Sequence, residues 1–103
     1  MEIKSKIANR TLYILLSGEL DECTASYTRR VMDTLFDTEK GYKQVVIDMS
    51  ELTFMDSTGV GVLIGRYKKL ATKSLPIYIS NPSNVAEKIF NMSGLYDIMP
   101  KIS

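Results

Sequence analysis

A continuous apolar run in the middle of the chain constrains the fold more than any other feature. Residues Val45–Met49 read Val-Val-Ile-Asp-Met. A run of this length is typical of an interior strand that is covered on at least one face. We therefore predict that this segment lies at the centre of a β-sheet.

The residues before this run predict a hairpin followed by a helix. Ile3–Ile7 and Thr11–Ser17 have strand character, and Asn9-Arg10 between them suits a tight turn. Asp21 can act as the N-cap of a helix that continues to about Thr38. The apolar face of that helix would hold residues spaced four apart, namely Cys23, Tyr27, Val31 and Leu35.

The residues after this run predict two further helices separated by a strand. One helix should extend from Ser57 to about Lys73, with basic residues near its carboxyl end that suit the helix dipole. Pro76–Ser80 reads as a strand with proline at its start. A third helix should begin near Asn84 and stop at Gly94. Its apolar face would hold Val85, Ile89 and Met92.

This order of elements predicts an α/β fold. We expect a single domain over residues 1–103, with a mixed β-sheet of four to five strands whose parallel part is made by right-handed crossovers. About three to four helices should pack mainly on one face. A fifth strand would be Ile98–Ile102, which Pro100 weakens.

Composition argues against several classes of function. Thirteen basic and twelve acidic side chains leave a formal net charge of +1, and the basic residues are scattered, so nucleic acid is not an expected partner. No apolar run approaches the roughly 20 residues that cross a bilayer, and the amino terminus lacks the apolar core of a signal peptide. We therefore expect a cytoplasmic protein without a membrane partner.

The sequence also lacks the usual residues of metal sites and hydrolases. Cys23 is the only cysteine, which excludes an internal disulfide, and histidine is absent. Absence of histidine removes the commonest zinc ligand and the usual general base of serine and cysteine hydrolases. We expect no metal site, no cofactor and no catalytic residue.

The densest cluster of unusual residues is the segment Leu52–Tyr67, which is predicted to run from a loop into a helix. Asp56 or Ser57 can accept hydrogen bonds from the free N–H groups of the first helical turn. Gly59 would let another surface approach the backbone there. On spacing alone, an ordinary helix cap is the favoured role of Ser57, because serine is among the leading cap residues.

The glycines of this segment do not complete a nucleotide-binding motif. A dinucleotide fingerprint would need glycine in place of Ile64, and a Walker A loop would need lysine in place of Arg66. Gly61 and Gly65 would instead form a smooth helix face for close packing, either against a partner or, as we expect, against the domain's own core.

The stretch from Phe54 to Lys68 resembles the signature of the STAS-domain anti-anti-sigma factors, which are antagonists of bacterial anti-sigma factors. Gly18–Asp21 and Met92–Leu95 resemble two further blocks of that family, in the right order. The resemblance thus covers nearly the whole chain and implies a STAS domain. Through Gly65–Lys68 and Met92–Leu95 the sporulation branch looks closest, with the general-stress branch as the near rival.

The resemblance implies a binding protein controlled by phosphorylation, not an enzyme. In this family the serine after the aspartate, here Ser57, is phosphorylated by the binding partner, an anti-sigma factor that is also an ATP-dependent serine kinase. Thr58 is the only adjacent competitor. The unphosphorylated antagonist binds the anti-sigma factor and releases the sigma factor. A metal-dependent serine phosphatase reverses the modification, and the free protein is expected to be a monomer.

The resemblance also implies which residues contact the partner. It places the Gly18–Asp21 turn beside the phosphoacceptor loop. The candidate contacts are Glu19, Asp21, Thr24, Asp56, Thr58, Gly59 and Gly61. Ordinary roles stay open, since Glu19 fits a solvated turn and Asp21 a helix cap. The basic residues Arg66, Lys68 and Lys69 would meet acidic groups on the kinase or simply be solvated.

Two other functions stay open at this point. One is a STAS subunit of a transport or scaffold complex that has no phosphate cycle, against which the intact Ser57-Thr58 pair argues. The other is a small serine enzyme in which Ser57 would be the nucleophile. Its only candidate bases are lysines such as Lys68 and Lys69, so we do not expect it.

Overall fold

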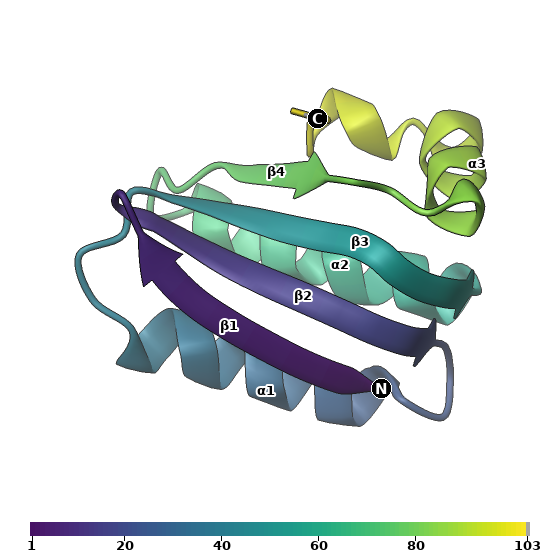
Figure 1. The fold of residues 1–103 in the computed structure, drawn as a ribbon, viewed down its shortest axis with the longest axis horizontal. Coiled ribbons are helices and arrows are strands. Elements are labelled where there is room, and N and C mark those ends of the chain that lie inside the picture. Colours follow the sequence, from purple (N-terminus) through teal and green to yellow (C-terminus); the bar gives the residue numbers. More distant parts are fainter. Residues whose placement is uncertain (103) are drawn as a thin grey trace.

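The computed structural model describes residues 1–102, and its strands form one sheet in the order β1-β2-β3-β4 (Figure 1). β1 (Glu2–Ala8) and β2 (Thr11–Leu20) form an antiparallel hairpin. Its turn residues Asn9 and Arg10 have φ angles of 52° and 62°, as in the turns that match strand twist. β3 (Gln44–Met55) is parallel to β2, and β4 (Ile77–Ser80) is parallel to β3. The predicted mixed sheet is confirmed.

Three helices and one 3-10 helix pack around this sheet. α1 (Ala25–Thr38) and α2 (Ser57–Ala71) lie behind it in Figure 1, whereas α3 (Asn84–Ser93) and η1 (Leu95–Asp97) lie along its β4 side. The core fills the space between the sheet and α1 and α2, and its fully buried strand residues include Leu12, Ile14, Leu16, Val45 and Ile47. No helix crosses the opposite face of β1 and β2 in Figure 1. The predicted α/β class is confirmed.

The parallel strands bring distant segments together at one end of the molecule. β2, β3 and β4 run in the same direction, and α1, α2 and α3 follow their carboxyl ends. Sites in open α/β sheets lie outside the carboxyl ends of the strands. Ser57, which follows β3 after one residue, lies at this end.

β3 extends well beyond the predicted strand, because Leu52–Met55 belongs to the strand and not to a loop. Two shifts in its register with β2 each give β3 one additional residue. The buried side chains of Met49, Leu52 and Met55 are consequently three residues apart. This spacing departs from the period of two of a regular strand. β2 likewise includes Gly18–Leu20, which was predicted as a turn.

α1 begins later than predicted and buries a different face. Its N-cap is Thr24, because Asp21 forms a turn of its own in which Oδ1 accepts from the backbone N–H of Cys23 at 2.9 Å. Cys23 and Tyr27 are exposed, and Val31 and Leu35 are only partly buried. The buried residues are Ala25, Thr28, Met32 and Phe36. The predicted apolar face is therefore wrong.

In the carboxyl-terminal part, the predicted end of the third helix at Gly94 is confirmed, but the predicted strand Ile98–Ile102 is not. α3 begins at Asn84 with Ser83 as its N-cap, and it ends at Gly94, which has a φ of 74°. Ala86 and Phe90 form the buried face, while Met92 is 78% exposed, so the predicted face is wrong. Within the predicted strand 98–102, Lys101 makes an isolated bridge to Ile79. Pro100 has no N–H to donate to a longer ladder.

Candidate functional site

Asp56 connects the beginning of α2 to the loop that follows β2. Its Oδ1 accepts from the backbone N–H of Gly59 at 2.9 Å, as an N-cap does. Its Oδ2 accepts from the backbone N–H of Glu22 at 3.2 Å. The helix cap expected from Asp56 or Ser57 is thus supplied by Asp56, and one carboxylate holds two segments together.

Ser57 is the first residue of α2 and is exposed. Its hydroxyl makes no hydrogen bond to any residue within 1–102, so the interpretation of Ser57 as a helix cap is wrong. The hydroxyl lies at the amino-terminal end of a helix, where the dipole and free N–H groups favour an anionic group. The neighbouring Thr58 is partly buried and therefore less accessible.

Gly59 is buried where α2 meets the end of β2. A Cβ atom at this position would overlap the backbone carbonyl oxygen of Leu20 and lie 2.8 Å from Cγ of Met55. The surface that approaches Gly59 therefore belongs to this chain. By contrast, a Cβ on Gly61 or Gly65 would meet nothing within 4 Å, so their predicted packing against the core is wrong.

The end of β2, which includes Gly18–Leu20, and the turn that follows it lie beside the Ser57 segment, because Leu20 pairs with Met55 and the Glu22 N–H donates to Asp56. Thr24 Oγ1 donates to the backbone carbonyl of Glu19 at 2.8 Å and accepts from the backbone N–H of Asp21 at 3.0 Å. Asp21 and Thr24 therefore hold the turn in shape. Glu19 is exposed and pairs in register with Phe54, two residues before Asp56.

Phe54 is a candidate contact residue for a protein partner that was not identified from the sequence. Its side chain is 46% exposed at the end of β3, between the buried residues Leu52 and Met55. A large exposed apolar residue next to charged groups is a feature of protein interfaces. The sequence carries no direct signal for it, because an alternating strand that buries Leu52 would also bury Phe54.

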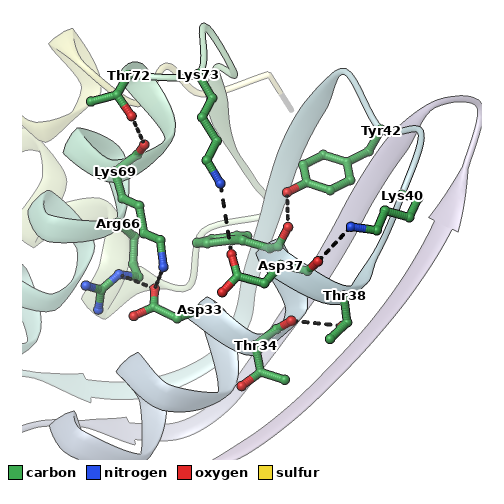
Figure 2. Close-up of polar contacts among 11 residues, drawn as sticks. Asp33, Thr34, Asp37, Thr38, Lys40, Tyr42, Arg66, Lys69, Thr72 and Lys73 are labelled. Carbon is green, nitrogen blue, oxygen red and sulfur yellow. Dashed lines mark hydrogen bonds and ion pairs between the residues drawn. The ribbon is translucent and has the colours of Figure 1, made fainter.

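The basic residues of α2 are engaged by α1 (Figure 2). Arg66 Nε lies 3.0 Å from Asp33 Oδ1, and Lys69 Nζ lies 3.4 Å from the same oxygen. Neither residue is simply solvated. Lys68 is exposed and forms no ion pair within residues 1–102. Of these three basic residues, Lys68 is therefore the one most available for contact with a partner.

Two further properties concern the whole of the described chain. Between residues 1 and 102, no three Cys, Asp or Glu side chains are grouped so that they could hold a metal ion. Nor does any helix in that range have the length and apolar character to span a membrane. The groups at the site are the exposed Ser57 hydroxyl at the amino-terminal end of α2, the capping carboxylate of Asp56 and the hydrogen-bonded turn after β2.

Comparison with known sequences identifies one family and its members. The model of the STAS domain matches residues 2–103. The anti-sigma F factor antagonist of Paenibacillus polymyxa is 33% identical over 100 residues, which are 97% of this chain and 85% of that protein. The anti-sigma-B factor antagonist of Listeria monocytogenes is 29% identical over 99 residues, which are 96% of this chain and 84% of that protein.

Two solved structures of the anti-sigma factor antagonist SpoIIAA, a Bacillus cell fate determinant, are similar to this fold. The unphosphorylated form has a TM-score of 0.77 at 30% identity and covers 99% of this chain and 89% of its own. The phosphorylated form has a TM-score of 0.71 at 30% identity, with coverages of 99% and 92%. The same fold is therefore found in both states of a similar protein.

Proposed function

The chain belongs to the STAS domain family, and we propose on this premise that it is an anti-sigma factor antagonist controlled by phosphorylation of Ser57. In the unphosphorylated state it binds an anti-sigma factor and thereby releases a sigma factor. One observation carries the proposal: the Ser57 hydroxyl is exposed and free of hydrogen bonds within residues 1–102, while Asp56 caps the helix.

The modification cycle follows from this role. The anti-sigma factor is itself a serine kinase that transfers the γ-phosphoryl group of ATP to Ser57 Oγ, which loses its proton, and ADP leaves. A metal-dependent serine phosphatase then hydrolyses the phosphoserine to serine and phosphate. The existence of SpoIIAA in unphosphorylated and phosphorylated forms supports such a cycle. The cycle takes place in the cytoplasm, and the free antagonist is a monomer.

A phosphate on Ser57 would act on the interface and not on the fold. It adds about −1.5 to −2 charges and three acceptor oxygens, which the amino-terminal end of α2 tolerates. In a docked interface the phosphate would be desolvated next to the Asp56 carboxylate, against a surface shaped for a hydroxyl. Loss of about 3 kcal/mol of binding free energy weakens binding by more than about a hundredfold.

The predicted contacts around Ser57 differ in how far they are exposed to a partner. Glu19 and Gly61 are exposed and can touch a partner directly. Asp21, Thr24 and Gly59 hold the β2–α1 turn and the start of α2 in position. Asp56 and Thr58, which flank Ser57, are partly buried. We expect the exposed residues to contribute to affinity and the others to the shape of the site.

The test is phosphorylation by the anti-sigma factor from the same genome. Incubation with this protein and ATP should add one phosphate, which peptide mass spectrometry should locate on Ser57. Ser57→Ala should stay unmodified, and Thr58→Ala, the matched control, should be modified. In size-exclusion chromatography only the unphosphorylated protein should elute with the anti-sigma factor. A phosphate that persists in Ser57→Ala and disappears in Thr58→Ala would move the switch to Thr58.

A further inference from the structure

We infer that the anti-sigma factor also docks on the open face of the sheet around Phe54. The surface that the anti-sigma factor uses for this contact would be basic and would contain an apolar pocket. This inference rests on the proposed function and extends its interface beyond the Ser57 loop. The occupant of this face of the sheet is the same anti-sigma factor that phosphorylates Ser57. The chemistry of that partner surface follows from what surrounds Phe54.

Phe54 is an exposed aromatic side chain with buried neighbours on its own strand. It is 46% exposed, whereas Leu52 and Met55 are 2% and 5% exposed. Exposed aromatic residues at the centre of an interface often supply much of its binding energy, because they fill a pocket on the partner. The apolar component of the proposed interface is therefore the Phe54 ring.

The geometry of β3 directs this ring away from the core. Gly18 pairs with Leu52 and Glu19 pairs with Phe54, so Thr53 is an additional residue that forms a β-bulge. The next pair, Leu20 and Met55, is buried among the core residues. Because neighbouring residues of a strand point to opposite faces, Phe54 and Glu19 lie on the face that α1 and α2 do not cover.

The Phe54 surface is continuous with the phosphorylation site. Ser57 is three positions after Phe54, which corresponds to at most about 11 Å of extended backbone. A typical protein interface covers about 800 Å² on each partner, which is a patch about 30 Å across and therefore wider than this separation. A partner that holds Ser57 can therefore also cover Phe54.

Uncompensated carboxylates surround this ring. Glu19 lies opposite Phe54. Glu51 lies three residues before Phe54 on β3, where its Oε1 accepts from the Ser17 hydroxyl at 2.8 Å. Neither Glu19 nor Glu51 forms an ion pair with lysine or arginine in the part of the chain described. By contrast, the exposed acids Glu2 and Asp37 are paired with Lys4 and Lys73. A complementary partner surface would be basic.

The experiment compares the affinity of variants for the anti-sigma factor from the same genome, by titration calorimetry. Phe54→Ala should weaken binding about tenfold or more. Ile7→Ala is the matched control, because Ile7 is 40% exposed but lies at the hairpin end of β1. Its affinity should stay within about twofold of wild type. Circular dichroism melting of each variant verifies that the fold is retained.

A charge variant tests the basic character of the partner independently. The double change Glu19→Lys and Glu51→Lys should weaken binding and reduce its salt dependence, because surface charge pairs are screened by salt. If Phe54→Ala bound with wild-type affinity while Ser57→Asp did not bind, the inference about Phe54 would be wrong and the proposed function would stand. Absence of wild-type binding would overturn the proposed function as well.

Discussion

At the scale of single residues, Asp56 and Ser57 have different roles at the start of α2. The Asp56 carboxylate accepts from Gly59 and Glu22 and so fixes the loop geometry. The Ser57 hydroxyl is left free. The proposed phosphorylation of Ser57 would therefore break no hydrogen bond that the described residues form.

Gly59 and Gly61 should respond oppositely to alanine. Gly59→Ala places a Cβ against the Leu20 carbonyl, a backbone group that cannot rotate away, and should lower the free energy of unfolding by about 1–3 kcal/mol. Gly61→Ala meets open space and should raise it by up to about 1 kcal/mol through helix propensity. Urea unfolding measures both, and equal effects would contradict the close contact at Gly59.

At the scale of elements, α1 and α2 are joined by charge as well as by apolar packing (Figure 2). The Arg66 side chain is 12% exposed, and its Nη1 is buried without a hydrogen-bond partner. Its 3.0 Å contact with Asp33 is an ion pair whose angles are not those of a hydrogen bond. Asp33 is thus the main compensation for a guanidinium that is largely out of water.

Loss of Asp33 should therefore destabilise the domain more than loss of a more exposed pair. Asp33→Ala leaves Arg66 without its counter-charge and should cost about 1–3 kcal/mol of unfolding free energy. Lys73→Ala is the control, because its 3.9 Å pair with Asp37 is about half exposed. That variant should change stability by less than about 0.5 kcal/mol. Thermal melts would refute the idea if both variants behaved alike.

At the scale of the whole molecule, the last described residues attach α3 and η1 to the sheet. The backbone N–H of Ile79 donates to the Pro100 carbonyl at 2.9 Å, and Lys101 Nζ lies 3.0 Å from Glu87 Oε2. The Tyr96 hydroxyl also donates to Glu87 at 3.1 Å. Glu87 therefore collects contacts from two segments beyond α3.

This arrangement makes stability sensitive to alkaline pH. Burial, together with the hydrogen bond to the Glu87 carboxylate, raises the pKa of Tyr96 to about 12. Unfolded tyrosine has a pKa of about 10, so its contribution is present below pH ~10 and is lost as the pH rises towards about 12. Tyr96→Phe should reduce the alkaline loss of stability, measured by urea unfolding from neutral pH upwards.

Tyr42 should also contribute to the loss of stability at alkaline pH, so Tyr96→Phe should remove only part of that loss. Burial and the nearby Asp37 raise the pKa of Tyr42, whose hydroxyl donates to the Phe36 carbonyl at 2.8 Å. Tyr42 should therefore continue to lower alkaline stability in the Tyr96→Phe variant. An alkaline loss in that variant equal to the wild-type loss would contradict the proposed contribution of Tyr96.

The sequence by itself determined the order of elements and the position of the candidate switch. The hairpin turn at Asn9-Arg10, the central strand at Val45–Met49 and the stop at Gly94 follow from local turn chemistry and periodicity. The family resemblance identified Ser57 and the Gly18–Asp21 block beside it. These features depend on short stretches of chain, which is why they could be predicted.

Only the tertiary structure decided which faces are buried and which groups are free. The two bulges of β3 arise from its pairing with β2, and they turn Phe54 outward. The Asx turn at Asp21 moves the start of α1, and Asp56 takes the cap that leaves Ser57 unbonded. Each outcome depends on a neighbour distant in sequence or on competition between adjacent polar groups, which local propensity does not contain.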